Sequence, residues 1–451
     1  MKKIIIFLLA LLSIAISVKS QGGTEEVFRL DADYSMHYTR PIIRFSPGTN
    51  IFVSYYEKDF HGVFVLSKQW NNTADTIELP HHYYVYDFEI FDTSVYFCGE
   101  QILPNTPNST SEAMVGKFDF LHPYNTGGIG NFDIQTFSVS REYSRLTKMV
   151  VYEDPNNQRP IVASIGFAEN NSQNSSSIHN GIDFVVYADV STQLIGVDTL
   201  PKERYYDIVE TDKYIVLVGT SLETALGDNI IGFRKFEKTA VTSSVKDDFY
   251  HTPLPHPEPM TLIVGEDING TDNFVTATFA IVNDEYGTIF RQYDAETMTM
   301  INSQFIPSGD DKIEPYELKH IYSEDMVLLL QSSTDSSYGT RVLSVDINPQ
   351  EDYTAMVDYC TQGWFYSIDR YVGNEYFAMG YSGSKPIYYI ADAFNNKGCI
   401  NEEGADIKIV GNYDLQPLTD QINLVAVLTS SKILSDKNIS SKNIFLDCRK
   451  K

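Results

Sequence analysis

A strand-rich unit of about 50 residues recurs along the chain, and a repeat of that length restricts the possible folds more than any other feature. The clearest copy, Tyr206 to Phe236, contains an apolar strand, an acidic turn, a more apolar strand, a polar loop and a third strand. Its most apolar strand occurs in eight copies, this one included, and successive copies start 44 to 66 residues apart. The copies begin at Ile51, Val95, Ile161, Ile215, Phe274, Met326, Tyr376 and Asn423.

A third strand follows in each unit, after a turn that usually carries glycine, which accepts the backbone angles that a hairpin needs. These strands begin at Gly62, Gly116, Gly181, Gly232, Gly287, Gly339, Pro386 and Asn443. A weaker fourth strand is visible at Asp75 to Pro80 and at Asp198 to Pro201. Units of four short antiparallel strands are what a β-propeller is built from, so the sequence predicts an all-β fold.

In strand pattern and period the chain resembles the β-propeller superfamily over nearly all of its length after residue 20. The resemblance implies a single domain, residues 21–451, in which each unit forms one blade. The Gly-His and Trp-Asp signatures of one well-known propeller class are absent from the units, and the chain contains only two tryptophans, Trp70 and Trp364. The resemblance therefore assigns the chain to the β-propeller superfamily as an expectation, but to none of its named subfamilies.

The two ends of the chain predict how the ring closes. The last unit, from Tyr413, has three strands, while Glu26 to Leu30 forms a strand that belongs to no unit. We predict an eight-bladed propeller in which this N-terminal strand is the outer strand of the last blade, so that both termini join one sheet. A seven-bladed propeller with a C-terminal extension is the alternative.

Residues 1–20 read as a secretory signal peptide of bacterial appearance. Lys2 and Lys3 precede an apolar run from Ile4 to Ile16, and Val18 to Ser20 form a cleavage site. No later segment approaches the 18 apolar residues that suggest a membrane-spanning helix. We therefore expect a secreted protein, whether periplasmic, attached to the cell surface or extracellular, with an uncleaved anchor as the alternative.

The chain is acidic, with a formal net charge of -26. The charge becomes about -29 once Lys2, Lys3 and Lys19 leave with the signal, and such a surface repels phosphate backbones and anionic lipids. Nucleic acids and membrane insertion are therefore not expected, and a glycan or an extracellular protein is the expected partner. The same charge also simply keeps a protein soluble.

The loops that join a fourth strand to the next first strand surround the mouth of a propeller channel. In this chain they hold aromatic rings beside histidine, arginine and carboxylate groups, a combination that suits a polar ligand such as a sugar. Tyrosines at strand starts also pack between blades, which is the structural alternative. The predicted ligand-binding residues are His81, His82, Tyr84, Arg141, Arg204, Tyr205, His256, Asp310 and Trp364.

Two further sites are predicted from short patterns. Asp267, Asn269 and Asp272 resemble an acidic calcium-binding loop, although Asn-Gly is also a strong turn signal and the other units have ordinary acidic turns there. No other cofactor is expected. Cys399 and Cys448 fall at the same end of adjacent predicted blades and are the expected disulfide, while Cys98 lies in an apolar strand as a buried thiol.

The sequence contains no Gly-x-Ser-x-Gly elbow, no His-Glu-x-x-His and no phosphate-binding glycine loop. We therefore predict a secreted or cell-surface binding module that displays loops for a glycan or protein ligand. An extracellular carbohydrate-active enzyme, a hydrolase or lyase with its site at the channel mouth, is the alternative. An enzyme should bring two or more titratable groups with perturbed pKa values together in a deep pocket.

Overall fold

The structure is a computed structural model of the chain. It describes residues 26–30, 39–68, 73–103, 110–120, 132–138, 143–156, 158–169, 182–189, 193–200, 203–221, 230–238, 248–253, 257–268, 271–282, 285–309, 313–321, 326–333, 340–346, 355–360, 364–371, 375–382, 385–392, 400–405, 408–409, 416–418, 423–424, 427–434 and 439–449. No helix in these ranges is long and apolar enough to cross a membrane. The predicted signal peptide lies outside them.

Consecutive strands pair in antiparallel groups of four. The first groups are β2 (Ile42–Ser46), β3 (Ile51–Lys58), β4 (His61–Lys68) and β5 (Thr73–Glu78); β6 (Tyr83–Phe91), β7 (Ser94–Leu103), β8 (Thr110–Asp119) and β9 (Phe132–Ser138); β10 (Tyr143–Glu153), β11 (Pro160–Glu169), β12 (Ile182–Asp189) and β13 (Gln193–Leu200); and β14 (Glu203–Glu210), β15 (Tyr214–Ser221), β16 (Ile230–Glu237) and β17 (Asp248–Pro253).

The following groups continue the same order. They are β18 (Pro257–Ile268), β19 (Thr271–Val282), β20 (Glu285–Asp294) and β21 (Met300–Gly309); β22 (Ile313–Ile321), β23 (Met326–Ser333), β24 (Thr340–Asp346) and β25 (Ala355–Cys360); and β26 (Trp364–Arg370), β27 (Glu375–Ser382) and β28 (Lys385–Asp392), beside which lies β1 (Glu26–Leu30).

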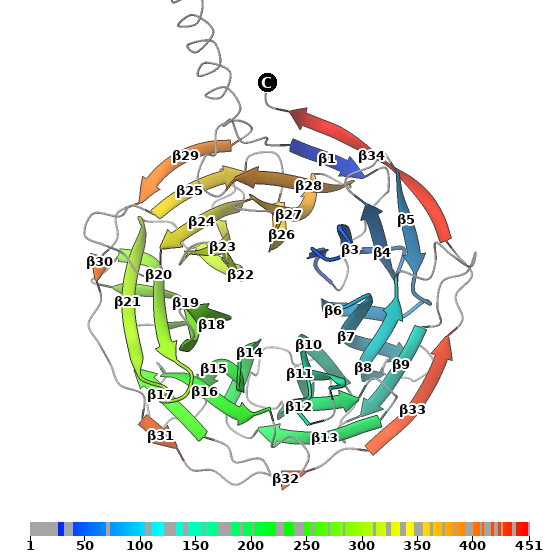
Figure 1. The fold of residues 1–451 in the computed structure, drawn as a ribbon, viewed down its shortest axis with the longest axis horizontal. Coiled ribbons are helices and arrows are strands. Elements are labelled where there is room, and N and C mark those ends of the chain that lie inside the picture. The colour runs from blue at the N-terminus through cyan, green and yellow to red at the C-terminus, as the bar shows by residue number, and fades with distance from the viewer. Residues whose placement is uncertain are drawn as a thin grey trace, which may run out of the picture.

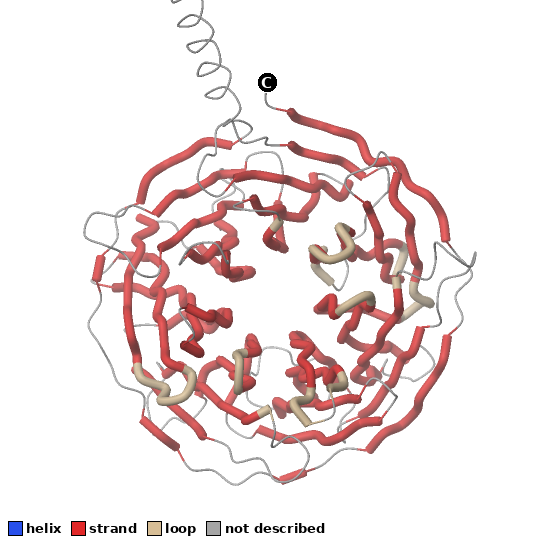
Figure 2. Tube along the Cα trace, viewed as in Figure 1, coloured by secondary structure: helices blue, strands red, loops and turns tan. Residues whose placement is uncertain are grey.

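The groups are arranged around a central axis, with the first strand of each group innermost (Figure 1). Each first strand contacts the first strands of the groups on either side, and β26 contacts β2. The described chain is almost entirely strand and short turns (Figure 2). This is the architecture of a β-propeller, and the prediction of an all-β fold is confirmed.

Apolar side chains fill the space between neighbouring sheets. Phe64 of β4 lies with its ring centroid 5.5 Å from that of Phe88 in β6 and 5.0 Å from that of Phe118 in β8. The junction between the β26–β28 group and the β2–β5 group is packed in the same way, with the centroids of Phe52 and Phe377 4.9 Å apart. Each sheet therefore buries both of its faces against neighbours.

The repeat predicted the inner part of the molecule correctly. The strands expected from the first seven markers are β3, β7, β11, β15, β19, β23 and β27. The eighth blade, predicted from Tyr413 onward, is wrong. The described strands of this segment pair with outer strands of the earlier groups and with β1, and not with one another, because an apolar pattern identifies a strand without identifying its partner.

These C-terminal strands form a belt that runs around the outside of the ring (Figure 1). Taken in chain order they pair with β25, β21, β17, β13 and β9, and the last pairs with both β5 and β1. The belt covers outer edges that would otherwise expose unpaired backbone groups. Its strands are β29 (Ile400–Ala405), β30 (Lys408–Ile409), β31 (Gln416–Leu418), β32 (Asn423–Leu424), β33 (Val427–Leu434) and β34 (Ile439–Arg449).

The N-terminal strand joins both ends of the chain, as predicted, but with a different inner neighbour. β1 lies between β28 and β34, with Phe28 opposite Tyr388 on one side and Arg29 opposite Phe445 on the other. The sequence predicted the contact between Glu26–Leu30 and the C-terminal strand. The other neighbour is β28, the outermost strand of the β26–β28 group, and not a strand of the segment that begins at Tyr413.

Five first strands share a bulge at matching positions. The pairing of β6 with β7 shifts between Val85 and Asp87, and β10, β14, β22 and β26 shift in the same way. The extra residues are Tyr86, Thr147, Tyr206, Tyr316 and Tyr366. Glycines on the second strand accept the displaced backbone: a Cβ atom at Gly99 would lie 1.8 Å from the carbonyl oxygen of Tyr84.

We predict that Gly99→Ala destabilises the protein by at least about 2 kcal/mol, because a fixed backbone carbonyl cannot move away as a side chain would. Urea denaturation followed by circular dichroism measures the change. Gly48→Ala is the control, since a Cβ atom at Gly48 meets nothing within 4 Å. Equal stability of the two variants would contradict the account of the bulge.

Candidate ligand-binding site

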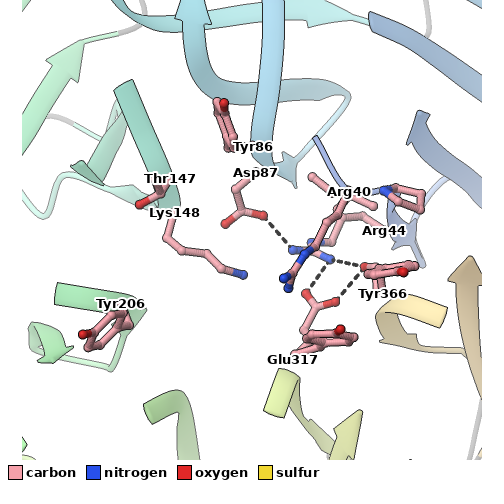
Figure 3. A pocket seen from close by; sticks show the side chains of 13 residues that line it. Arg40, Arg44, Tyr86, Asp87, Thr147, Lys148, Tyr206, Glu317 and Tyr366 are labelled. Carbon is pink, nitrogen blue, oxygen red and sulfur yellow. Dashed lines mark hydrogen bonds and ion pairs between the residues drawn. The ribbon is translucent and has the colours of Figure 1, made fainter. Parts of the chain in front are cut away.

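A cavity of about 240 Å³ lies where the first strands face the axis (Figure 3). Its lining comes from β2 and the residues just before it, and from β6, β10, β14, β22 and β26. The lining residues are Arg40, Pro41, Ile42, Arg44, Tyr86, Asp87, Thr147, Lys148, Tyr206, Tyr316, Glu317, Tyr366 and Ser367. They lie in the first half of each strand, near the end where the loops between groups enter.

The bulges build this lining. All five bulge residues line the cavity, and in four of the five strands the next residue lines it as well. In a regular strand, successive side chains point to opposite faces, whereas a bulge turns two neighbouring side chains toward the same side. Each affected strand therefore contributes a tyrosine or threonine and, in four strands, also a charged or hydroxyl group.

Arg44 is the most connected side chain of the site. Its Nη2 lies 2.9 Å from Oδ1 of Asp87, its Nη1 2.8 Å from Oε1 of Glu317, and its Nε 3.3 Å from Oε1 of Glu89. Arg44, Asp87 and Glu317 are all buried. One guanidinium group thus joins β2 to β6 and β22, strands that belong to three different sheets.

Both buried carboxylates also accept hydrogen bonds from the backbone. Asp87 accepts from the Phe88 amide at 3.0 Å and, on its other oxygen, from the Met149 amide at 3.1 Å. These contacts extend the network from β6 to β10.

Glu317 is held in the same manner. Its Oε2 accepts from the Ser367 hydroxyl at 2.6 Å and from the Ile368 amide at 2.8 Å. Together with Arg44, these donors leave neither oxygen of Glu317 without a partner, and they extend the network from β22 to β26.

Burial and neighbouring charges shift the pKa values of these groups in different directions. Burial alone would raise the pKa of Glu317, but Arg44, Lys319 and Lys148, with the Ser367 hydrogen bond, lower it to about 2. Burial raises the pKa of Asp87 despite the opposing charges of Lys148 and Arg44. Burial alone would lower the pKa of Lys148, but the negative charges of Asp87, Asp207 and Glu317 outweigh this effect and raise it. The ammonium group of Lys148 is therefore charged at neutral pH.

Two other cations face the cavity without sharing the connections of Arg44. The ammonium of Lys148 projects into the cavity (Figure 3), and it makes no ion pair or hydrogen bond with another residue of the described ranges. The guanidinium of the exposed Arg40 lies 4.4 Å from the ring centroid of Tyr316 and 5.7 Å from that of Tyr366. Both cations are therefore placed to meet a ligand.

The tyrosines form a rigid aromatic wall. The rings of Tyr316 and Tyr366 are stacked with centroids 5.3 Å apart, and Tyr366 stacks in turn on Tyr381 at 5.2 Å. The hydroxyl oxygens of Tyr366 and Tyr381 are 2.8 Å apart. On the opposite side of the axis, the Tyr86 hydroxyl donates to Oε1 of Glu100 at 2.7 Å.

None of the predicted ligand-binding residues whose side chains the structure describes is part of the lining of this cavity. His81 and His82 occupy the turn between β5 and β6, where His81 is exposed and its ring centroid lies 5.0 Å from that of His61. Tyr84 and Tyr205 are 1% and 6% exposed, and Trp364 is half-buried.

The other predicted residues have no described side chain. Arg141, His256 and Asp310 lie outside the described residues, and Arg204 belongs to β14 without a described side chain. A site in the loops between the groups therefore stays a prediction.

The residues that do line the cavity left a signal in the sequence. In four units a residue pair such as Tyr86-Asp87 stands in the first strand, and a glycine such as Gly99 ends the apolar core of the second strand. The other pairs are Thr147-Lys148, Tyr206-Asp207 and Tyr366-Ser367, with Gly166, Gly219 and Gly380. Read together, pair and glycine indicate a bulge.

The proposed calcium ligands fall in the hairpin between β18 and β19, where Asp267 pairs with Asp272. The Asp272 carboxylate accepts from the backbone amides of Asp212 at 2.7 Å and Lys213 at 3.1 Å, which fixes a turn of the neighbouring sheet. Asn269 lies outside the described residues. Within those ranges, no group of three or more metal-ligating side chains is present.

Two of the three cysteines with a predicted role, Cys98 and Cys448, lie in described strands. Cys448 lies in β34 opposite Val27, whereas Cys399 falls outside the described residues, so their disulfide stays a prediction. Cys98 is a buried free thiol, as expected, and burial raises its pKa.

We predict that Glu317→Gln removes about 3 kcal/mol of stability at neutral pH, because a pKa lowered from 4.5 to about 2 favours the folded state. A lowered pKa stabilises the protein above the unfolded value, and this contribution is lost as the pH falls toward 2. The difference in unfolding free energy from the unchanged protein should therefore shrink between pH 5 and about 2.

Chemical denaturation at a series of pH values measures this difference. Glu153→Gln, at an exposed position, is the matched control and should unfold like the unchanged protein throughout. A deficit for Glu317→Gln that stays constant with pH would show that the carboxylate charge is not what stabilises the fold.

No protein-family model and no curated protein sequence matches the chain. Among solved structures, Drosophila Plexin A in complex with Semaphorin 1b is similar at 6% identity and a TM-score of 0.37, covering 80% of this chain and 88% of that one. Drosophila Semaphorin 1b, extracellular domains 1-2, gives 7% identity, a TM-score of 0.32 and the same coverage. The Bombyx mori GH32 beta-fructofuranosidase gives 10% identity and a TM-score of 0.30, covering 86% and 94%.

Proposed function

We propose that the protein is a secreted binding module that holds a small polar ligand, such as one unit of a glycan, in the axial cavity. The observation that carries this proposal is the wall of bulge residues, in which tyrosine rings stand beside cations that have room to meet a ligand. Sugars are commonly bound by stacking on aromatic faces and by hydrogen bonds to polar tips. The cavity is preformed by strands, so binding orders little of the protein.

A carbohydrate-active enzyme is the second candidate, and the pKa values favour it. Two carboxyl groups at one cavity, one with a raised and one with a lowered pKa, are what acid–base catalysis uses. We favour binding because the oxygens of Asp87 and Glu317 already accept hydrogen bonds from Arg44 and the backbone. A general acid or base must instead reach the substrate.

We propose export on the basis of the N-terminal signal sequence, and acidic charge makes nucleic acids and anionic membranes unsuitable partners. We further propose seven blades, with β1 as the fourth strand of the last blade and β34 joining that blade to the first. The contact of β26 with β2 and the position of β1 between β28 and β34 support this closure.

A designed disulfide tests the closure. Val27 lies opposite Cys448, so Val27→Cys in a Cys399→Ser background should form an intramolecular bond on oxidation. Peptide mapping by mass spectrometry without reduction detects the linked N- and C-terminal peptides. Arg29→Cys, opposite Phe445, is the control that should give no link. Equal yields from the two variants would contradict the pairing.

A glycan array probed with residues 21–451 tests the binding function, followed by calorimetry with the glycans that bind. We expect binding without turnover, and an affinity at least tenfold weaker for Tyr206→Ala, because Tyr206 presents its ring at the cavity (Figure 3). Phe60→Ala, which removes a half-exposed aromatic residue that is not part of the described cavity lining, is the control. Turnover of a bound glycan would favour the enzyme, and binding unaffected by Tyr206→Ala would reject this cavity.

A further inference from the structure

Some of the charged groups around the cavity form ion pairs with one another, and others do not. Among the described residues, its lining contains three cations and two carboxylates. Arg44 is bound to both carboxylates, Asp87 and Glu317, at 2.9 and 2.8 Å. Two cations, Arg40 and Lys148, remain without such an ion pair in the described part of the chain.

Lys148 has the stronger requirement for a partner. An ammonium group carries three donors and no acceptor, and charged groups withdrawn from bulk water are normally paired. Lys148 lies on β10 directly after the bulge residue Thr147, and the bulge directs its side chain toward the axis (Figure 3). No described residue accepts a hydrogen bond from it, so its donors are available inside the cavity.

The surrounding carboxylates keep Lys148 charged without binding it. Asp87, Asp207 and Glu317 favour its protonated form electrostatically. Asp87 and Glu317 nevertheless direct their oxygens at Arg44 and at backbone amides. Lys319, with its Nζ 3.7 Å from Oε1 of Glu317, offsets a further part of this negative charge. An incoming anion therefore meets an available cation, while the two carboxylates of the lining, Asp87 and Glu317, are already compensated.

We infer that the cavity selects a sugar ring that carries an anionic group, a carboxylate or a phosphate, and that Lys148 anchors this group with help from Arg40. The inference rests on the proposed function and narrows its ligand. The size of the cavity, about 240 Å³, is below the roughly 300–1,000 Å³ usual for larger ligands, so the site accommodates one ring.

The charge of the whole molecule limits the ligand further. The chain carries a formal charge of -26, and a long polyanion would have to lie against that acidic surface. A single terminal acidic sugar needs to present only one negative charge to the axis. We therefore expect free or terminal acidic sugars to bind, and long polyanionic chains to bind more weakly per unit.

Titration calorimetry of residues 21–451 with three probes tests the inference. The probes are glucuronate, glucose 6-phosphate and glucose, which distinguish a carboxylate, a phosphate and an uncharged ring. We expect at least one anionic probe to bind at least tenfold more tightly than glucose, with an affinity that falls as salt is raised.

Substitutions at Lys148 identify the anchor. Lys148→Met keeps the length of the side chain and removes the charge, and it should abolish the preference for the anionic probe over glucose. Lys148→Arg should retain part of the preference. Lys213→Met is the control for a lost positive charge, because Lys213 is an exposed lysine in the turn between β14 and β15. It should leave the affinity for each of the three probes unchanged. Thermal unfolding of each variant confirms that it is folded.

The outcomes separate the two proposals. If glucose and the anionic probes bind equally and Lys148→Met changes neither, the cavity binds sugars but the anion inference is overturned. If none of the probes and no array glycan binds, the proposed function itself is overturned. If Lys148→Met proves unfolded, loss of preference in the folded Lys148→Arg variant would still decide against Lys148 as an anion anchor that acts through its charge.

Discussion

The guanidinium group of Arg44 is the interaction on which the centre of the molecule depends. It holds Asp87 and Glu317, and these carboxylates in turn bind backbone amides of β10 and β26. Five first strands, far apart in the sequence, are thereby fixed to one another around the axis. Removing one member would leave an uncompensated buried charge, which is far more costly than the net value of the ion pair itself.

The same network sets the chemistry of the cavity. Because Arg44 occupies both carboxylates, they are unavailable to a ligand, yet their charges keep the pKa of Lys148 high. Arg44, Asp87 and Glu317 thus stabilise the fold, while Lys148 of the same cluster stays available to a ligand. The bulges make this division possible, since they bring a second side chain of the same strand to the axis, and glycines such as Gly99 make room for the displaced backbone.

The sequence predicted the repeat far better than the site. Apolar runs such as Ile215 to Gly219 are buried on both faces, and burial of this kind leaves a clear pattern. The direction of side chains within a first strand is harder to predict, because a bulge reverses the alternation and shows in the sequence only when the residue pair is read together with the glycine of the second strand. Tyr205 was predicted to bind a ligand and is buried, whereas its neighbour Tyr206 lines the cavity. For the C-terminal segment, strand character was readable, but the choice of partner depends on which outer edges the finished ring presents.

The belt has a consequence for the order in which the protein folds. Pairing Glu26 with Arg449 directly would require the closure of a loop of nearly the whole chain. The belt strands instead meet the sheets in reverse order, beginning with β25, which is closer to β29 in the sequence than β21, β17, β13, β9 or β5. Each pairing leaves the next belt strand close to the next sheet, so one long closure becomes a series of short ones. Because β34 pairs with both β5 and β1, its docking requires that the outer strands of the first and last groups are already in place.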